Sequence, residues 1–235
     1  MSDWAPKRFW QETSVVDAED GFEVRLDTRP VRTPAKQPLV LPSRALADAV
    51  AEEWQAQEER IDPRRMPVTR SANAAIDKVR PQQAEVAAML SAYGDSDLLC
   101  YRAEGPAELV ARQEAGWDPM LDWAAATFEA RLEPRTGVMH APQDPDALAK
   151  LAAAVARLDA FELAAFHDLV SLTGSLVLGL AAERGQDAET IWRLSRIDEE
   201  WQAELWGADD EATRVAEEKR TDFNHAVRFL TLLRA

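Results

Sequence analysis

Residues 169–182 read LVSLTGSLVLGLAA, and no charged side chain occurs between Asp168 and Glu183. A helix that is apolar on every face must be surrounded by protein or by lipid. A bilayer span needs about 20 apolar residues, so this run is too short to cross a membrane. We therefore predict that it lies at the centre of a helical domain, with Gly174 and Gly179 letting neighbouring helices approach closely.

The flanks of this run carry helix-end signals. Asp159 can cap a helix N-terminus, and Glu162, three residues later, can complete a capping box. Gly185 is suited to the left-handed conformation that ends many helices. These signals predict one continuous helix from Asp159 to Gly185.

Composition excludes several classes of function. The 235 residues include 42 acidic and 27 basic side chains, which gives a net charge of −15. Nucleic acids and anionic membranes need a basic surface, so neither is expected as a partner. Cys100 is alone, so the chain has no internal disulfide and no cysteine-based zinc site. The opening MSDWAPKRFW resembles neither a signal peptide nor a presequence, and we expect a cytoplasmic protein.

The first 42 residues have the alternation of β-strands. Asp20-Gly21 separates two apolar alternations, which is a strong hairpin signal. The segment 30–34 should be extended and 39–41 should be a strand, so we predict a small antiparallel sheet over 8–42. Helix signals then predict helices over 43–58, 69–79, 81–93, 106–131, 144–158, 187–206 and 211–233. The fold class is α+β: a small N-terminal β-sheet domain with helices, residues 1–98, followed by a larger all-α domain, residues 99–235.

Catalytic motifs are scarce in the sequence. It contains no glycine-rich phosphate loop, no Gly-x-Ser-x-Gly and no His-Glu-x-x-His, so we expect no cofactor and no metal. The best catalytic candidate is the pair His167-Asp168. A metal hydrolase would need further His and Asp ligands, and a hydrogen-bonded histidine is the competing interpretation. A hydrolase or transferase with an acidic cleft around His167 and Asp168 is the alternative function.

Asp187 to Gly207 is the segment with the clearest surface features. Both ends have capping residues, and a single helix is predicted. At 100° per residue, one apolar stripe contains Ile191, Leu194, Trp201 and Leu205. Trp192 and Trp206 fall outside the stripe, towards solvent. They indicate either a partner site or further core beneath the terminal helix.

Two acids of this segment have different predicted positions. Asp198 falls within the apolar stripe, where a carboxylate must either be paired with a buried arginine or become neutral. Its predicted role is structural. Glu200 falls off the stripe and needs no internal partner, so its position alone indicates an ordinary solvated acid.

An ordered set of short motifs runs along nearly the whole chain. The set comprises Arg8-Phe9-Trp10, Leu26-Asp27-x-Arg29-Pro30-Val31-x-Thr33-Pro34, Glu53-Trp54-x-x-Gln57, Pro67-x-Thr69-Arg70-x-x-Asn73-x-x-Ile76-Asp77, Tyr93-Gly94-x-x-Asp97-Leu98-Leu99-Cys100-Tyr101-Arg102, Trp117-Asp118-Pro119, Ser175-x-Val177-Leu178-Gly179 and Glu200-Trp201-Gln202-x-x-x-Trp206-Gly207. Together these motifs resemble the assembly chaperones for the F1 sector of ATP synthase, the branch that holds the alpha subunit.

The resemblance implies both a fold and a role. The family has a small N-terminal domain with an antiparallel sheet and a larger helical C-terminal domain. Its members bind unassembled alpha subunit without ATP and prevent its aggregation until beta subunits replace them, and they are not enzymes. The family's functional acid maps onto Glu200, two positions from Asp198. The expected client-binding residues are Trp192, Asp198, Glu200, Trp201, Gln202 and Trp206. A bacterial, cytoplasmic and monomeric protein is expected.

Overall fold

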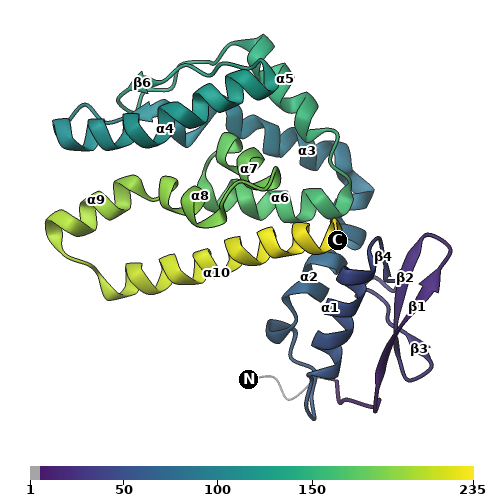
Figure 1. Cartoon of the computed structure of the whole chain (residues 1–235). Coiled ribbons are helices and arrows are strands. Elements are labelled where there is room, and N and C mark those ends of the chain that lie inside the picture. The colour runs from purple at the N-terminus through teal and green to yellow at the C-terminus, as the bar shows by residue number, and fades with distance from the viewer. Residues whose placement is uncertain (1–5) are drawn as a thin grey trace. The chain divides into compact units, whose positions relative to one another are not determined.

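The chain forms two compact units in the computed structural model, which describes residues 6–235 (Figure 1). The first unit contains the chain up to Gln83 together with Asp159–Ala165 and Arg228–Ala235. The second unit contains Ala84–Leu158 and Phe166–Val227. The expected α+β class is confirmed, with a small antiparallel sheet near the N-terminus and mostly helices after it. That residues 1–98 and 99–235 fold as separate domains stays a prediction.

The N-terminal sheet is built on a hairpin of β1 (Thr13–Ala18) and β2 (Gly21–Leu26). The predicted turn is confirmed, since Ala18 pairs with Gly21. Gly21 has a φ of +145°, and a Cβ there would lie 2.3 Å from the Leu41 carbonyl oxygen, so the position requires glycine. Two short strands, β3 (Arg29–Pro30) and β4 (Val40–Leu41), also pair antiparallel with β2.

Helix α1 (Arg44–Gln55) packs against β1 and β2. Ser43 begins it as predicted, because its Oγ accepts a hydrogen bond from the Leu46 amide at 3.1 Å. Leu46 and Val50 are fully buried together with Val24 of the sheet. The elements that follow are η1 (Pro63–Arg65), α2 (Pro67–Ala74), the π-helical η2 (Ala75–Val79) and η3 (Arg80–Gln82).

The remaining elements are mainly helical. In chain order they are α3 (Gln83–Ser91), η4 (Ala92–Ser96), η5 (Leu98–Cys100), β5 (Tyr101–Arg102), α4 (Ala107–Phe128), β6 (Arg135–Thr136), α5 (Pro145–Val155), α6 (Ala160–Thr173), α7 (Leu176–Glu183), α8 (Ala188–Leu194), α9 (Ile197–Trp206) and α10 (Asp210–Leu233). Strands β5 and β6 pair in parallel. Within residues 6–235, none of the helices has the length and hydropathy that a bilayer span requires.

The apolar run is buried as predicted, but it is not one helix. Every residue of α7 from Leu176 to Ala182 is buried. The predicted capping box is present, with Asp159 Oδ1 accepting from the Glu162 amide at 2.8 Å and Glu162 Oε2 accepting from the Asp159 amide at 3.0 Å. Helix α6 ends before Gly174, whose φ is +69°, and the Ser175 Oγ caps the N-terminus of the next helix, α7. A glycine followed by a capping serine ends one helix and starts another, and the apolar composition obscured this signal.

Asp97 joins η5 to α7 from a fully buried position. Its Oδ1 accepts a hydrogen bond from the Leu99 amide and its Oδ2 accepts one from the Val177 amide, each at 3.0 Å. Burial raises the pKa of this carboxyl from 3.8 to about 6, although the hydrogen bonds act in the opposite direction. Asp97 therefore titrates close to neutrality.

We expect stability to depend on pH through Asp97. Because its folded-state pKa lies above its unfolded value, the folded chain holds the proton more tightly. This contribution is complete below about pH 4 and is lost as the pH rises through 6, a change of roughly 3 kcal/mol at 1.36 kcal/mol per pKa unit. Urea unfolding at several pH values from 4.5 to 7.5 gives the free energy of unfolding of the wild type and of the Asp97→Asn variant. The difference between these two free energies should change with pH. The exposed Asp222→Asn variant is the control, and a difference for Asp97→Asn that is constant with pH would contradict the expectation.

Candidate functional site

The segment predicted as a single helix over residues 187–206 forms two helices, α8 and α9, separated at Ser195 and Arg196. Its N-terminus is capped as predicted, since Asp187 Oδ2 accepts from the Thr190 amide at 2.9 Å. At the break, the Trp117 indole Nε1 donates a 2.7 Å hydrogen bond to the Leu194 carbonyl. That contact from α4 satisfies a carbonyl at the end of α8, and nothing in the local sequence announces it.

The break changes which side chains are exposed. Trp192 is 6% exposed and lies beside Phe223 of α10, with ring centroids 5.7 Å apart, so the solvent-facing position is wrong and the alternative, further core beneath the terminal helix, is right. Leu205 was predicted on the buried stripe, and this is also wrong, because it is 55% exposed. Trp206 is 78% exposed, as predicted. Counting 100° per residue continuously from residue 187 therefore does not predict which residues after the break are buried.

Asp198 has an internal partner, although not an arginine. The buried Gln113 of α4 donates from Nε2 to Asp198 Oδ1 at 2.7 Å, and its Oε1 accepts from the Ala103 amide at 2.8 Å. The half-buried carboxylate is thus paired with an amide, and the expected pairing with a buried arginine is wrong. The contact attaches the first turn of α9 to α4.

A second contact attaches the end of α9 to α4. Arg112 donates from Nη1 and Nη2 to the two carboxylate oxygens of Glu204, at 2.8 and 2.6 Å. The mutual hydrogen bond raises the pKa of Arg112 and lowers that of Glu204. The Arg112 guanidinium also lies 4.8 Å from the ring centroid of the half-buried Trp201. A Cβ on Gly116 would lie 2.8 Å from Ile197 Cδ1, which shows how closely the two helices approach.

Several side chains of α9 are exposed. Glu200 and Gln202 are exposed, and the Glu200 carboxylate makes no hydrogen bond or ion pair within the part of the chain that the structure describes. Leu205 and Trp206 add large exposed apolar side chains at the C-terminal end of the helix. Grouped exposed apolar side chains beside polar groups are typical of protein-binding surfaces.

The catalytic candidate has an ordinary local explanation. His167 Nδ1 lies 3.0 Å from the carboxylate of its neighbour Asp168, and this hydrogen bond raises the pKa of the histidine. Among residues 6–235 no group of three or more His, Cys, Asp or Glu side chains could hold a metal ion. Cys100 is buried, and burial raises the pKa of its thiol to about 12, which suppresses the nucleophilic thiolate.

Two residues that organise this surface escaped the sequence analysis. Arg112 and Gln113 lie on a helix that was predicted, but no spacing rule relates them to residues 85 or more positions later. The motif Trp117-Asp118-Pro119 was the only local indication that this part of α4 is special.

The exposed apolar and polar side chains of α9 are typical of a protein-binding surface. Comparisons with known proteins agree. The model of the ATP12 chaperone protein family matches residues 7–125. Crystallised Atp12 from Paracoccus denitrificans is 55% identical, with a TM-score of 0.94 over 97% of this chain and 98% of that one. An aspartate-to-lysine variant of the same Paracoccus protein matches at 55% identity and a TM-score of 0.95, over 99% and 100% of the two chains. A candidate chaperone from Agrobacterium tumefaciens is 44% identical, with a TM-score of 0.92 over 97% of this chain and 86% of that one.

The chain belongs to the ATP12 chaperone family. The resemblance to ATP synthase assembly chaperones is thereby confirmed.

Proposed function

We propose that the protein is an ATP-independent chaperone that binds the unassembled alpha subunit of F1-ATPase and prevents its aggregation before the alpha/beta hexamer forms. In this proposal it is a monomer of the bacterial cytoplasm, it needs no cofactor and it is not an enzyme. Membership of the ATP12 chaperone family is the observation that carries the proposal.

The exposed side chains of α9 are the proposed contact with the client. An unassembled subunit exposes an apolar interface that aggregates unless it is covered. Leu205 and Trp206 can cover apolar surface, and Glu200 can pair with a basic group beside it. Such a moderate and partly polar contact also lets the chaperone dissociate when beta subunits arrive. Gln202 and Trp201 complete the proposed surface. Asp198 supports it through its hydrogen bond with Gln113. Trp192 is buried, so it is not part of the proposed surface.

Light scattering of alpha subunit diluted from denaturant tests the proposal directly. We expect the protein to suppress scattering without ATP at about equal molar ratio, because a covering contact is stoichiometric and needs no nucleotide. A strict ATP requirement, or unchanged scattering at several-fold excess, would refute it.

Two matched substitutions on α9 locate the contact. Glu200→Ala should leave the free energy of unfolding within roughly 0.5 kcal/mol of wild type, as exposed substitutions usually do, yet reduce protection in the scattering assay. Asp198→Ala should instead lower stability by about 1–3 kcal/mol, because it leaves the buried Gln113 amide unpaired. Asp222→Ala, an exposed acid on α10, is the control for charge removal. Full protection by Glu200→Ala would make Glu200 ordinary surface.

A further inference from the structure

The first unit contains a cavity of about 860 Å³. Its apolar lining comes from four separate stretches of the chain, with Pro34, Trp54, Ile61 and Met66 contributing. Met66 is buried, while Ile61 and Trp54 are partly accessible. The cavity is therefore large enough and apolar enough to hold a sizeable side chain.

Two polar atoms that belong to the lining residues have no partner. Trp54 Nε1, a donor, and Asn73 Oδ1, an acceptor, are both buried without a hydrogen bond. Buried polar groups in native proteins are nearly always paired, so each unpaired atom needs an explanation. Both atoms are closed to solvent, so a ligand in the cavity contacts the side chains that carry them and not the atoms themselves.

The charge around the cavity is opposite to that of the protein. Arg32, Arg70 and Lys78 line it and are exposed. Within residues 6–235, neither the Arg70 side chain nor the Lys78 side chain makes a hydrogen bond or an ion pair. The one lining carboxylate, Asp77, is already engaged, accepting from Thr33 Oγ1 at 2.6 Å and from the Ala35 amide at 3.0 Å. A cationic rim on a chain of net charge −15 favours an acidic ligand at this place.

Some polar side chains near the cavity have hydrogen-bond partners within the fold, whereas Trp54 Nε1 and the Arg70 guanidinium do not. Glu53 accepts hydrogen bonds from the Val68 amide at 2.7 Å and from the Thr69 amide and hydroxyl at 2.8 and 2.7 Å, so it caps α2. Burial raises the pKa of this carboxyl. Trp54 and Arg70, each adjacent in sequence to one of these residues, have no comparable polar contact. The segments that contain Glu53 and Thr69 therefore also carry Trp54 Nε1 and the Arg70 guanidinium, which have no hydrogen-bond partner within the described residues.

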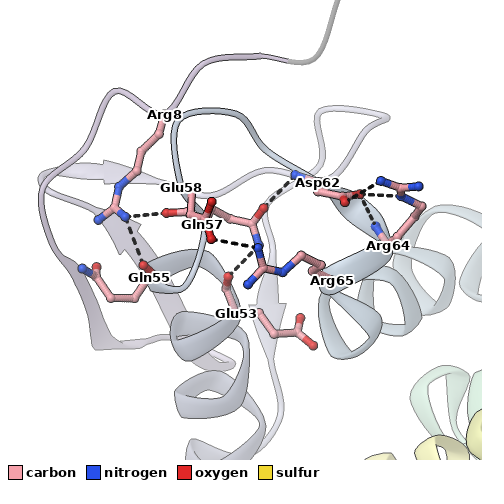
Figure 2. Close-up of polar contacts among 8 residues, drawn as sticks. All are labelled: Arg8, Glu53, Gln55, Gln57, Glu58, Asp62, Arg64 and Arg65. Carbon is pink, nitrogen blue, oxygen red and sulfur yellow. Dashed lines mark hydrogen bonds and ion pairs between the residues drawn. The ribbon is translucent and has the colours of Figure 1, made fainter. Parts of the chain in front are cut away.

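One wall of the cavity is held in place by hydrogen bonds (Figure 2). Ile61 and Pro63 belong to the loop after α1, in which the buried Gln57 accepts from the Asp62 amide at 2.7 Å and donates to the Glu53 carbonyl at 3.1 Å. Arg64 pairs with Asp62 and lowers the pKa of that carboxyl to about 2. A wall fixed in this way need not be ordered when a ligand binds, which reduces the entropic cost of binding.

We propose that this cavity binds an extended peptide segment of a client protein. An apolar side chain of the segment occupies the lining around Trp54 and Ile61, and a neighbouring carboxylate pairs with Arg70 and Lys78. The site goes beyond the proposed function, since it lies in the first unit whereas α9 belongs to the second.

Titration of the full chain with a synthetic peptide tests the proposal. The probe is acetylated and amidated Ser-Gly-Asp-Phe-Asp-Gly-Ser, followed by calorimetry and by the indole N–H resonances of the ¹⁵N-labelled protein. The Trp54→Phe variant assigns the Trp54 resonance. We expect this resonance to move on saturation, and the Arg70→Glu and Lys78→Glu variants to weaken binding by about tenfold or more, because each reverses a charge that faces the carboxylates. A probe with serine in place of phenylalanine, or lysine in place of both aspartates, should lose binding.

Controls separate this site from α9 and from general charge effects. Arg157→Glu reverses an exposed charge in the other unit, and it should bind the probe as wild type does. Glu200→Ala should also bind the probe normally, so loss of alpha-subunit protection and loss of peptide binding are separable results. An unmoved Trp54 resonance, equal affinity of Arg70→Glu and wild type, or equal binding of the lysine probe would each overturn the proposal.

Discussion

Replacement of Leu178 by aspartate should abolish cooperative unfolding or leave the protein insoluble. Leu178 is fully buried in α7, with buried residues on both sides of it in the chain. A buried charge without a partner costs several kcal/mol, a large part of the roughly 5–15 kcal/mol that stabilises a typical domain. Thermal and urea unfolding followed by circular dichroism would measure the effect.

The matched control is Ser171→Asp, which adds the same charge at an exposed position on α6. It should unfold within a few degrees of wild type, as surface substitutions do. A Leu178→Asp variant that melts as Ser171→Asp does would mean that α7 is not central to the fold.

Replacement of Trp117 by alanine should be the most damaging change on α4. The indole is fully buried beneath Arg102, whose guanidinium carbon lies 5.3 Å from its ring centroid. Large-to-small changes of buried aromatic residues cost about 3–5 kcal/mol. The Trp117→Phe variant keeps most of the ring but leaves the Leu194 carbonyl without its donor, and it should lose about 1–3 kcal/mol.

The Trp117→Phe variant also connects stability with function. Because the lost hydrogen bond holds the junction of α8 and α9, a folded variant should protect the alpha subunit less well in the scattering assay. Trp206→Phe, at an exposed position on α9, should change stability by no more than roughly 0.5 kcal/mol. Equal urea midpoints for Trp117→Phe and wild type would show that the hydrogen bond contributes nothing.

Local signals were sufficient wherever the structure is set by near neighbours. The Asp20-Gly21 turn, the Ser43 cap and the Asp159–Glu162 capping box were predictable because their hydrogen bonds close within a few residues. The break at Gly174 had a local signal too, but fourteen uncharged residues argued for continuity. The break at Ser195 had none, and the Leu194 carbonyl beside it accepts a hydrogen bond from an indole 77 positions earlier in the chain.

The candidate surface was predictable only in part. Exposure of Trp206 followed from its position at the end of a helix, and the need of Asp198 for an internal partner followed from its apolar neighbours. The identity of that partner, Gln113, depends on how α4 meets α9, which a single sequence does not encode at short range. Trp192 was misplaced because Phe223 of α10 packs against it, and that contact is 31 positions away in the sequence.

Helix α9 contains no fully buried residue. It is held to α4 by the Gln113–Asp198 hydrogen bond and by Arg112. The Arg112 guanidinium forms an exposed ion pair with Glu204 and also lies over the Trp201 ring. Exposed ion pairs contribute little and are screened by salt. Detaching this helix therefore costs much less free energy than global unfolding, and the detachment can stop at Ser195, where the helical hydrogen bonding is already interrupted. We therefore expect the element proposed to hold the client to open locally, so that an arriving subunit can displace it while α7 stays folded.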